Sequence, residues 1–93
     1  MSYDIRNNEQ ESRFETIVDG HTAFTMYDLE DPNRIVFTHT EVPQELAGRG
    51  IAQLLVRTAL EHARDRKLTV VPQCAYVAKF IERNAEFEEL TRS

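Results

Sequence analysis

The sequence contains a single cysteine, Cys74, so no internal disulfide can form, and we expect a protein of the reducing cytoplasm. No apolar run approaches the ~18 residues that a membrane helix needs, and residues 1–12 lack the apolar segment of a signal peptide. We therefore expect no contact with a membrane. Because the three histidines are scattered and only one thiol is present, no zinc-binding spacing occurs, and we expect no metal site.

An excess of positive charge is also missing. The net charge is −5, which argues against general nucleic-acid binding. Residues 1–45 contain ten acidic and three basic side chains, whereas residues 46–83 contain three acidic and seven basic ones. This division favours an anionic ligand on the second part and a cationic one near the first. The alternative is that the two sets of charges interleave once the chain is folded.

The length of 93 residues predicts one domain over residues 1–93, and the hydrophobic fraction of 41% is typical of a globular protein. The sequence has no repeats or low-complexity segments. A domain of this size buries only about two thirds of the surface of its unfolded chain, so a ligand or a second copy would stabilise it appreciably. A homodimer is therefore one possible assembly.

The first half of the chain has the alternating pattern of a β meander. A weak alternation predicts a short edge strand near residues 3–7, and residues 13–18 and 21–28 predict two strands joined by the hairpin turn Asp19-Gly20. A turn at residues 31–33 precedes a β-branched and aromatic strand over residues 34–40.

The second half changes to helical periodicity. Apolar residues at spacings of one, three and four predict an amphipathic helix over residues 50–67. Residues 68–71 predict a strand buried on both faces, and residues 75–83 a second helix. Strand, helix and strand form a βαβ unit, so strands 34–40 and 68–71 should be parallel. The predicted fold class is α+β, an antiparallel meander joined to one parallel unit.

Two of the three glycines, Gly48 and Gly50, lie directly before the long helix on either side of Arg49. The first amides of a helix have no partner within it, and glycine lets an anion approach them closely. A phosphate or diphosphate would fit there, with Arg49 as a charged donor. The alternative is a simple tight turn. The spacing matches neither the P-loop nor the dinucleotide-binding motif, because the required lysine or third glycine is missing.

Several short motifs follow one another in a set order: His39-Thr40-Glu41-Val42-Pro43, Gly48-Arg49-Gly50-Ile51-Ala52, Leu54-Leu55-Val56, Val71-Pro72-Gln73-Cys74, Tyr76-Val77 and Asn84-Ala85-Glu86-Phe87. Together with the order of predicted elements they resemble the GNAT superfamily of acyl-CoA N-acyltransferases, and most closely its small YjdJ-type branch. The resemblance covers about residues 13–90 and implies a minimal GNAT-like fold.

The resemblance implies a site for acetyl-coenzyme A. In that superfamily the diphosphate rests on the amides that open this helix, here at Gly48, Arg49, Gly50, Ile51 and Ala52, and the pantetheine arm enters between two diverging parallel strands, here 34–42 and 68–72. The amide of Val42 is a candidate donor to the thioester carbonyl. Lys79 and Arg83 share one helix face and are candidates for the 3′-phosphate, although a solvated stripe is the alternative. Tyr76, at the start of the last helix, could form a hydrogen bond with the thiol; the alternative is a residue of the core or rim.

Departures from the superfamily pattern affect the expected chemistry. Ala47 stands where relatives have a polar residue, so binding should depend more on backbone amides and Arg49. A tyrosine that protonates the thiolate in larger relatives is replaced by Phe80 or Ile81, and the segments that cover the acceptor site have no counterpart. We therefore expect an open acceptor side.

Three residues are candidates for catalysis. Cys74 precedes a helix, where a thiolate is favoured, and could accept an acyl group; the alternative is a buried structural thiol. His39 and Glu41 are two residues apart on a strand, so they should share a face, together with Ile35 and Phe37. Such a pair could deprotonate an ammonium group; the alternative is a structural histidine beside a solvated glutamate.

We therefore expect acetyl transfer from acetyl-coenzyme A to a primary amine, on a small molecule or a peptide, either by direct attack or through Cys74. A non-catalytic coenzyme-A-binding module is the alternative, because the tyrosine acid and the acceptor walls are missing. The sequence does not identify the amine.

Overall fold

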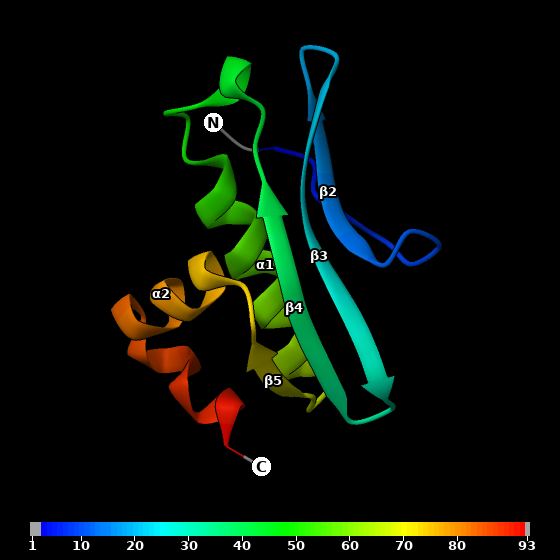
Figure 1. Ribbon diagram of the computed structural model, residues 1–93, viewed down its shortest axis with the longest axis vertical. Helices are drawn as coiled ribbons and strands as arrows, with labels where there is room; N and C mark the ends of the chain where they lie inside the picture. The colour runs from blue at the N-terminus through cyan, green and yellow to red at the C-terminus, as the bar shows by residue number, and fades with distance from the viewer. Residues whose placement is uncertain (1–2, 93) are drawn as a thin grey trace.

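The computed structural model describes residues 3–92, so residues 1, 2 and 93 of the predicted domain lie outside it. Five strands form one sheet in the order β1-β2-β3-β4-β5 (Figure 1). Their bounds are β1 (Arg6–Asn8), β2 (Arg13–Val18), β3 (His21–Asp31), β4 (Arg34–Glu41) and β5 (Thr69–Pro72). The first four strands pair antiparallel, and β4 pairs parallel with β5, which confirms the predicted α+β class.

The hairpin between β2 and β3 turns where the sequence predicts it. Asp19 and Gly20 have φ values of 52° and 80°, and Val18 pairs with His21. These left-handed conformations are those of a two-residue hairpin turn. The edge strand β1 spans Arg6–Asn8 and so begins three residues after the start of the predicted range 3–7, and β3 is three residues longer than predicted.

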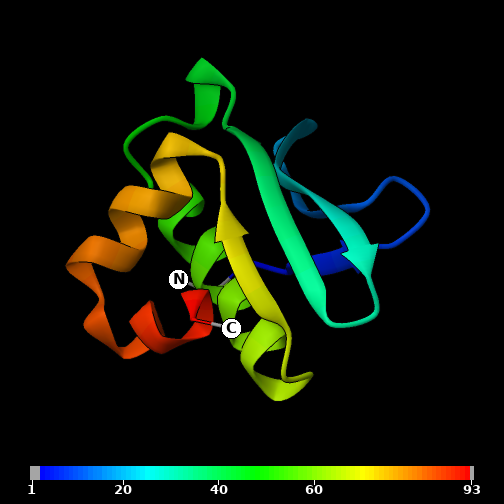
Figure 2. The ribbon, with the colours of Figure 1, turned by 60° about the horizontal axis from the view of Figure 1, so that its bottom comes forward.

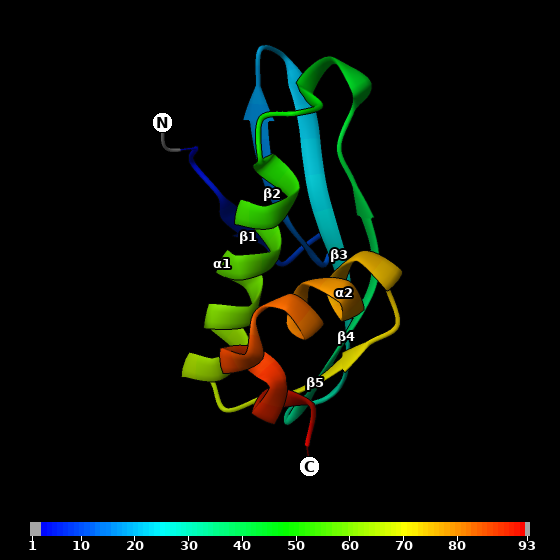
Figure 3. The ribbon, with the colours of Figure 1, turned by 90° about the vertical axis from the view of Figure 1, so that its left-hand side faces the viewer.

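Within residues 3–92, two α-helices and two short 3-10 helices complete the fold: η1 (Gln44–Leu46), α1 (Ile51–Asp65), α2 (Ala75–Arg83) and η2 (Ala85–Thr91). Helix α1 lies behind the sheet in Figure 1 and beside α2 in Figure 3. It is shorter than the predicted range of residues 50–67, because Gly50 caps its start and Lys67 adopts a left-handed φ of 57° after its end. No helix among residues 3–92 is long and apolar enough to cross a membrane.

One hydrophobic core joins α1, α2 and η2 to the sheet. Its largest fully buried side chains include Phe37 from β4, Leu55 from α1 and Phe87 from η2. The prediction that β5 is buried on both faces is wrong, because only Val70 of that strand is buried. Val70 faces the core, and its neighbours in the strand lie half-exposed because β5 is at the edge of the sheet.

Strand β4 contains a β-bulge. Tyr27 of β3 pairs with Phe37, but the preceding Met26 pairs with His39, so Thr38 has no partner of its own in β3. An extra residue on one strand reverses the alternation of side chains beyond it. The residues of β4 after Thr38 therefore face opposite sides from those that an unbroken strand would give them.

The bulge overturns the predicted arrangement of His39 and Glu41. Ile35 and Phe37 face the core, and after the bulge it is Thr40 that points to that side, where its hydroxyl lies 2.8 Å from the hydroxyl of Thr25. His39 and Glu41 do share a face, but it is the face opposite to Ile35 and Phe37.

Strands β4 and β5 separate where the bulge begins. Their pairing ends at Phe37 and Pro72, and one further bond follows, in which the amide of Cys74 donates to the carbonyl of Phe37 at 2.8 Å. Beyond it β4 continues to Glu41, whereas the chain after β5 turns away into α2 (Figure 2). The structure thus opens between the two parallel strands, as the resemblance implies.

Candidate functional site

A groove with a volume of about 510 Å³ lies between the outer face of α1 and α2. It is lined by Tyr3, Arg49, Gly50, Gln53, Leu54, Arg57, Tyr76, Lys79, Phe80, Arg83 and Asn84. The groove includes one stripe of α1, because spacings of three and four place residues along the same side of a helix. The residues of that stripe are Gly50, Gln53, Leu54 and Arg57. The opposite stripe of α1 is buried against the sheet.

A second cavity of about 240 Å³ adjoins this groove and shares Gly50, Gln53 and Tyr76 with it. It extends from the start of α1 toward the end of β4 and is lined in addition by Val42, Leu46, Ala47, Gly48, Ile51 and Ala52. All of the residues expected to contact the cofactor therefore lie along two adjoining hollows. We refer to these two hollows together as the α1–α2 groove.

The start of α1 exposes backbone amides toward the α1–α2 groove. Gly48 and Gly50 have φ values of 81° and 76°, and a Cβ atom built at either position would meet nothing within 4 Å. The glycines thus serve the backbone conformation rather than close packing. No side chain caps the helix at Gly50, so the first amides of α1 are available to an anion.

Four cationic side chains and no carboxylate line the larger hollow, within the described residues 3–92. Arg49 pairs with Asp19 of the β2–β3 hairpin at 3.1 Å, and Arg57 donates to the amide oxygen of Asn84 at 3.1 Å. Lys79 and Arg83 form no ion pair with the part of the chain that the structure describes. This concentration of positive charge in an acidic protein favours a polyanionic ligand.

Tyr76 lies where the two hollows meet and is 38% exposed. Partial burial raises the pKa of its phenol above the ordinary value, and the nearby charge of Arg83 acts in the opposite direction. The phenol therefore remains protonated at neutral pH and can donate a hydrogen bond into the groove.

Cys74 lies at the point where β4 and β5 separate, as the residue before α2. Its thiol is almost buried and donates to the hydroxyl of Thr40 at 3.4 Å, and Thr40 in turn contacts Thr25. Cys74 is not among the residues that line the two hollows. The structure thus ties the thiol to β4 and β3 through two hydroxyl groups.

His39 and Glu41 lie on the exposed face of the sheet, away from α1. The Nε2 atom of His39 is 3.2 Å from the Oε1 atom of Glu41, and the imidazole ring packs near the ring of Phe24, with centroids 6.2 Å apart. The structure therefore brings these two predicted residues together but separates them from the thiol of Cys74, which points into the protein. His39 is 57% exposed, so its ring is open to an incoming molecule.

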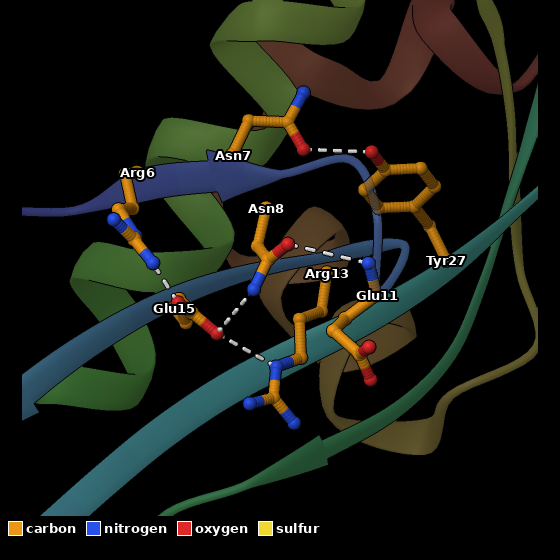
Figure 4. A network of polar contacts seen from close by, with 7 residues as sticks. All are labelled: Arg6, Asn7, Asn8, Glu11, Arg13, Glu15 and Tyr27. Carbon is orange, nitrogen blue, oxygen red and sulfur yellow. Dashed lines mark hydrogen bonds and ion pairs between the residues drawn. The ribbon is translucent and has the colours of Figure 1, made fainter.

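A polar network that the sequence analysis did not anticipate lies on the same face (Figure 4). Glu15 is only 3% exposed and accepts hydrogen bonds from Arg13 at 2.8 Å, Arg6 at 3.1 Å and Asn8 at 3.2 Å. The bond from Arg13 is the main cause that lowers the pKa of Glu15, and burial opposes it. The guanidinium of Arg13 also lies 4.7 Å from the centre of the Phe24 ring, so the network reaches the neighbour of His39. Alternation in the strands could have indicated that Arg13 and Glu15 share a face, but not their partners in β1.

No group of three or more His, Cys, Asp or Glu side chains within residues 3–92 is arranged to hold a metal ion.

Comparisons with known proteins agree with the resemblance in the sequence. A family model described as GCN5-related N-acetyl-transferase matches residues 13–90. Protein NATD1 of Mus musculus is 28% identical over 82 residues, which cover 86% of this chain and 74% of that protein. Protein NATD1 of Bos taurus is 34% identical over 62 residues, which cover 67% of this chain and 55% of that protein, so the match spans little more than half of the bovine protein.

A similar solved structure supports the fold. The solution structure of a GCN5-like protein from Staphylococcus aureus superimposes with a TM-score of 0.74 at 28% sequence identity. The superposition covers 97% of this chain and 89% of that one.

Proposed function

Because the chain belongs to the GCN5-related N-acetyltransferase family, we propose that it transfers the acetyl group of acetyl-coenzyme A to a primary amine, with the coenzyme bound in the α1–α2 groove. One observation carries this proposal. The hollow lined by Arg49, Arg57, Lys79 and Arg83 adjoins a second hollow, which lies along the start of α1 and is lined by Val42, directly after β4. A long polyanion with a narrow, uncharged arm fits that combination of charge and shape.

Particular residues would hold the parts of the coenzyme. The amides at the start of α1 and the side chain of Arg49 would bind the diphosphate, and Lys79 and Arg83 would bind the 3′-phosphate. The lining residue Ala47 offers no polar side chain, so backbone donors carry more of this binding. The arm would pass Tyr76 and reach the amide of Val42, which would polarise the carbonyl of the thioester.

The amine would approach from the opposite face of the sheet. The bulge at Thr38 turns His39 and Glu41 away from the core, and their face carries no helix over β2 and β3 (Figure 1). His39 would take a proton from the ammonium group, and Glu41 would stabilise the resulting imidazolium. The amine nitrogen then bonds to the carbonyl carbon and the carbon–sulfur bond breaks. The second proton of the nitrogen passes to the departing sulfur, so coenzyme A leaves as a thiol.

The distribution of charge favours a cationic acceptor. Apart from the four cations of the groove, the chain has seven basic residues against sixteen acidic ones. An amine in a positively charged context would be attracted to this remaining surface. Lysine side chains of peptides and polyamines both meet that description.

A relay through Cys74 is the second candidate mechanism. The observation that favours it is the position of Cys74 where β4 and β5 separate. Its amide donates the last hydrogen bond between the two segments, to the carbonyl of Phe37. The thiol would accept the acetyl group by thioester exchange and pass it to the amine. Direct attack is favoured because the sulfur is nearly buried and points toward Thr40 rather than into the hollows. Cys74→Ala distinguishes the two routes: it should leave the rate unchanged in direct attack and abolish transfer in a relay.

The test uses the purified protein with acetyl-coenzyme A and a panel of lysine peptides, polyamines and small amines. We expect release of free thiol that depends on the amine. His39→Gln should lower kcat/KM by about 100-fold, which is typical for loss of a general base. His21→Gln, in the hairpin outside both hollows, is the matched control. Binding of acetyl-coenzyme A without thiol release with any amine would instead favour a binding module, and no binding would refute the proposal.

A further inference from the structure

We propose that Tyr3 forms the adenine-binding wall of the α1–α2 groove, where its ring stacks on the base of coenzyme A; this inference rests on the proposed function. Tyr3 is far in sequence from the predicted cofactor residues, yet it lines the same hollow as Arg49 and Lys79. It reaches this place because the segment before β1 crosses beside α1 (Figure 3).

The side chain of Tyr3 is partly buried against the hydrophobic core. Tyr3 and Ile5 both pack against the hydrophobic core, and Asn7, two residues further, accepts a hydrogen bond from the phenol of Tyr27 at 2.6 Å (Figure 4). Alternation along the segment thus directs these side chains to the side of α1. An aromatic ring that is already ordered loses little freedom when a flat ligand stacks on it.

The chemistry of the lining residues indicates which part of the coenzyme each of them would contact. Its phosphates are attracted to the four cations, but adenine is flat and uncharged and needs an apolar or aromatic surface. Three aromatic residues line the larger hollow. Phe80 is nearly buried with the guanidinium of Arg57 over its ring, 5.4 Å from the centroid, and Tyr76 borders the second hollow. Tyr3 is the aromatic ring that remains for the base.

The expected course of the ligand along the groove also brings the base to Tyr3. If the arm lies toward Val42 and the diphosphate at Gly50, the nucleoside extends over the exposed stripe of α1. That stripe presents Leu54 as an apolar surface, with Tyr3 as a further wall of the same hollow. The base would thus meet Leu54 and Tyr3, and the 3′-phosphate would remain within reach of the cations on α2.

The test compares coenzyme A with 4′-phosphopantetheine, which has the same arm but lacks the 3′-phosphoadenosine and one phosphate of the diphosphate. Tyr3→Leu keeps an apolar side chain against the core and removes the aromatic ring, and Tyr3→Phe keeps the ring. Calorimetric titration should show coenzyme A affinity about 5- to 100-fold lower for Tyr3→Leu, the range expected for loss of one stacked base. The affinity of 4′-phosphopantetheine should stay unchanged, and Tyr3→Phe should bind both ligands as the wild type does.

Thermal unfolding of each variant checks that the fold is retained. Equal weakening of both ligands by Tyr3→Leu would overturn the inference, since the residue would then act through the fold. Unchanged affinity for coenzyme A would overturn it as well. If the wild-type protein bound 4′-phosphopantetheine and coenzyme A equally well, the 3′-phosphoadenosine part would add nothing to binding. The inference and the proposed roles of Lys79 and Arg83 would then fail, while acetyl transfer itself stood. If the protein bound neither ligand, the inference and the proposed function would both fail.

Discussion

The ion pair between Arg49 and Asp19 links the β2–β3 hairpin to the start of α1, and it leads to a prediction about ligand affinity. The Nη1 atom of Arg49 lies 3.1 Å from the Oδ2 atom of Asp19, and Arg49 also lines the α1–α2 groove. A bound diphosphate would have to share this guanidinium with the carboxylate. We therefore expect Asp19→Asn to raise the affinity for acetyl-coenzyme A.

The size of the effect follows from exposure. Arg49 and Asp19 are 41% and 70% exposed, so water and salt screen their interaction. Exposed pairs contribute about 0.2–1 kcal/mol, which corresponds to a gain in affinity of at most about fivefold. Asparagine also tolerates the left-handed conformation of position 19, where φ is 52°, so the hairpin should be preserved.

Calorimetric titration of acetyl-coenzyme A into the wild type, Asp19→Asn, Arg49→Gln and the double variant tests this reasoning. Arg49→Gln should weaken binding about 10- to 100-fold, as expected for a lost charged hydrogen bond. Asp19→Asn should have no effect in that background. The matched control is Asp28→Asn, an exposed acidic residue further along β3. Lower affinity in Asp19→Asn would refute the reasoning, because the carboxylate would then align Arg49 for binding.

Two further predictions concern stability. Gly50→Ala should lower the free energy of unfolding by about 1–2 kcal/mol, because a φ of 76° disfavours a side chain even where space is open. Gly50→Asn should lower it less, since asparagine tolerates this conformation better. Equal losses of both variants in urea denaturation would contradict this prediction. Glu15→Gln should lower stability by about 1–3 kcal/mol at pH 7, because the buried carboxylate accepts three hydrogen bonds. Because the pKa of Glu15 is lowered in the folded state, the ionised carboxylate stabilises the fold fully above the unfolded pKa of about 4.3, and this stabilisation is lost as the pH falls further. The difference in Tm between the wild type and Glu15→Gln should therefore disappear at low pH. A difference that persisted at low pH would show that packing, not charge, is responsible.

Elements that depend on local patterns could be predicted from the sequence. Helix α2 has the predicted bounds, Ala75–Arg83, because its apolar residues recur at helical spacing after a strand that ends in proline. The turn at Asp19-Gly20 was predictable because few residue pairs adopt two successive left-handed conformations. The candidate cofactor residues near Gly50 could be grouped from the sequence for a similar reason, since they follow one another along the chain.

The face on which His39 lies could not be predicted from local patterns. Alternation along an unbroken strand places it with Phe37 on the core side, whereas the bulge at Thr38 places it on the open face. A bulge is set by how β4 pairs with β3, and the residues of β4 alone carry no sign of it. The bonds to Glu15 from β1 and the entry of Tyr3 into the groove likewise join segments that are separate in the sequence.

The sequence by itself therefore determined the order of the strands and α-helices, the bounds of β2 and α2, and the position of the glycine-containing loop before α1. These features follow from propensity and periodicity, which act over a few residues. Only the tertiary structure decided the face on which His39 lies, the partners of Glu15 and the walls of the groove. Each of those depends on strand register or on the packing of distant segments, whose free energy comes from contacts that exist only in the folded chain.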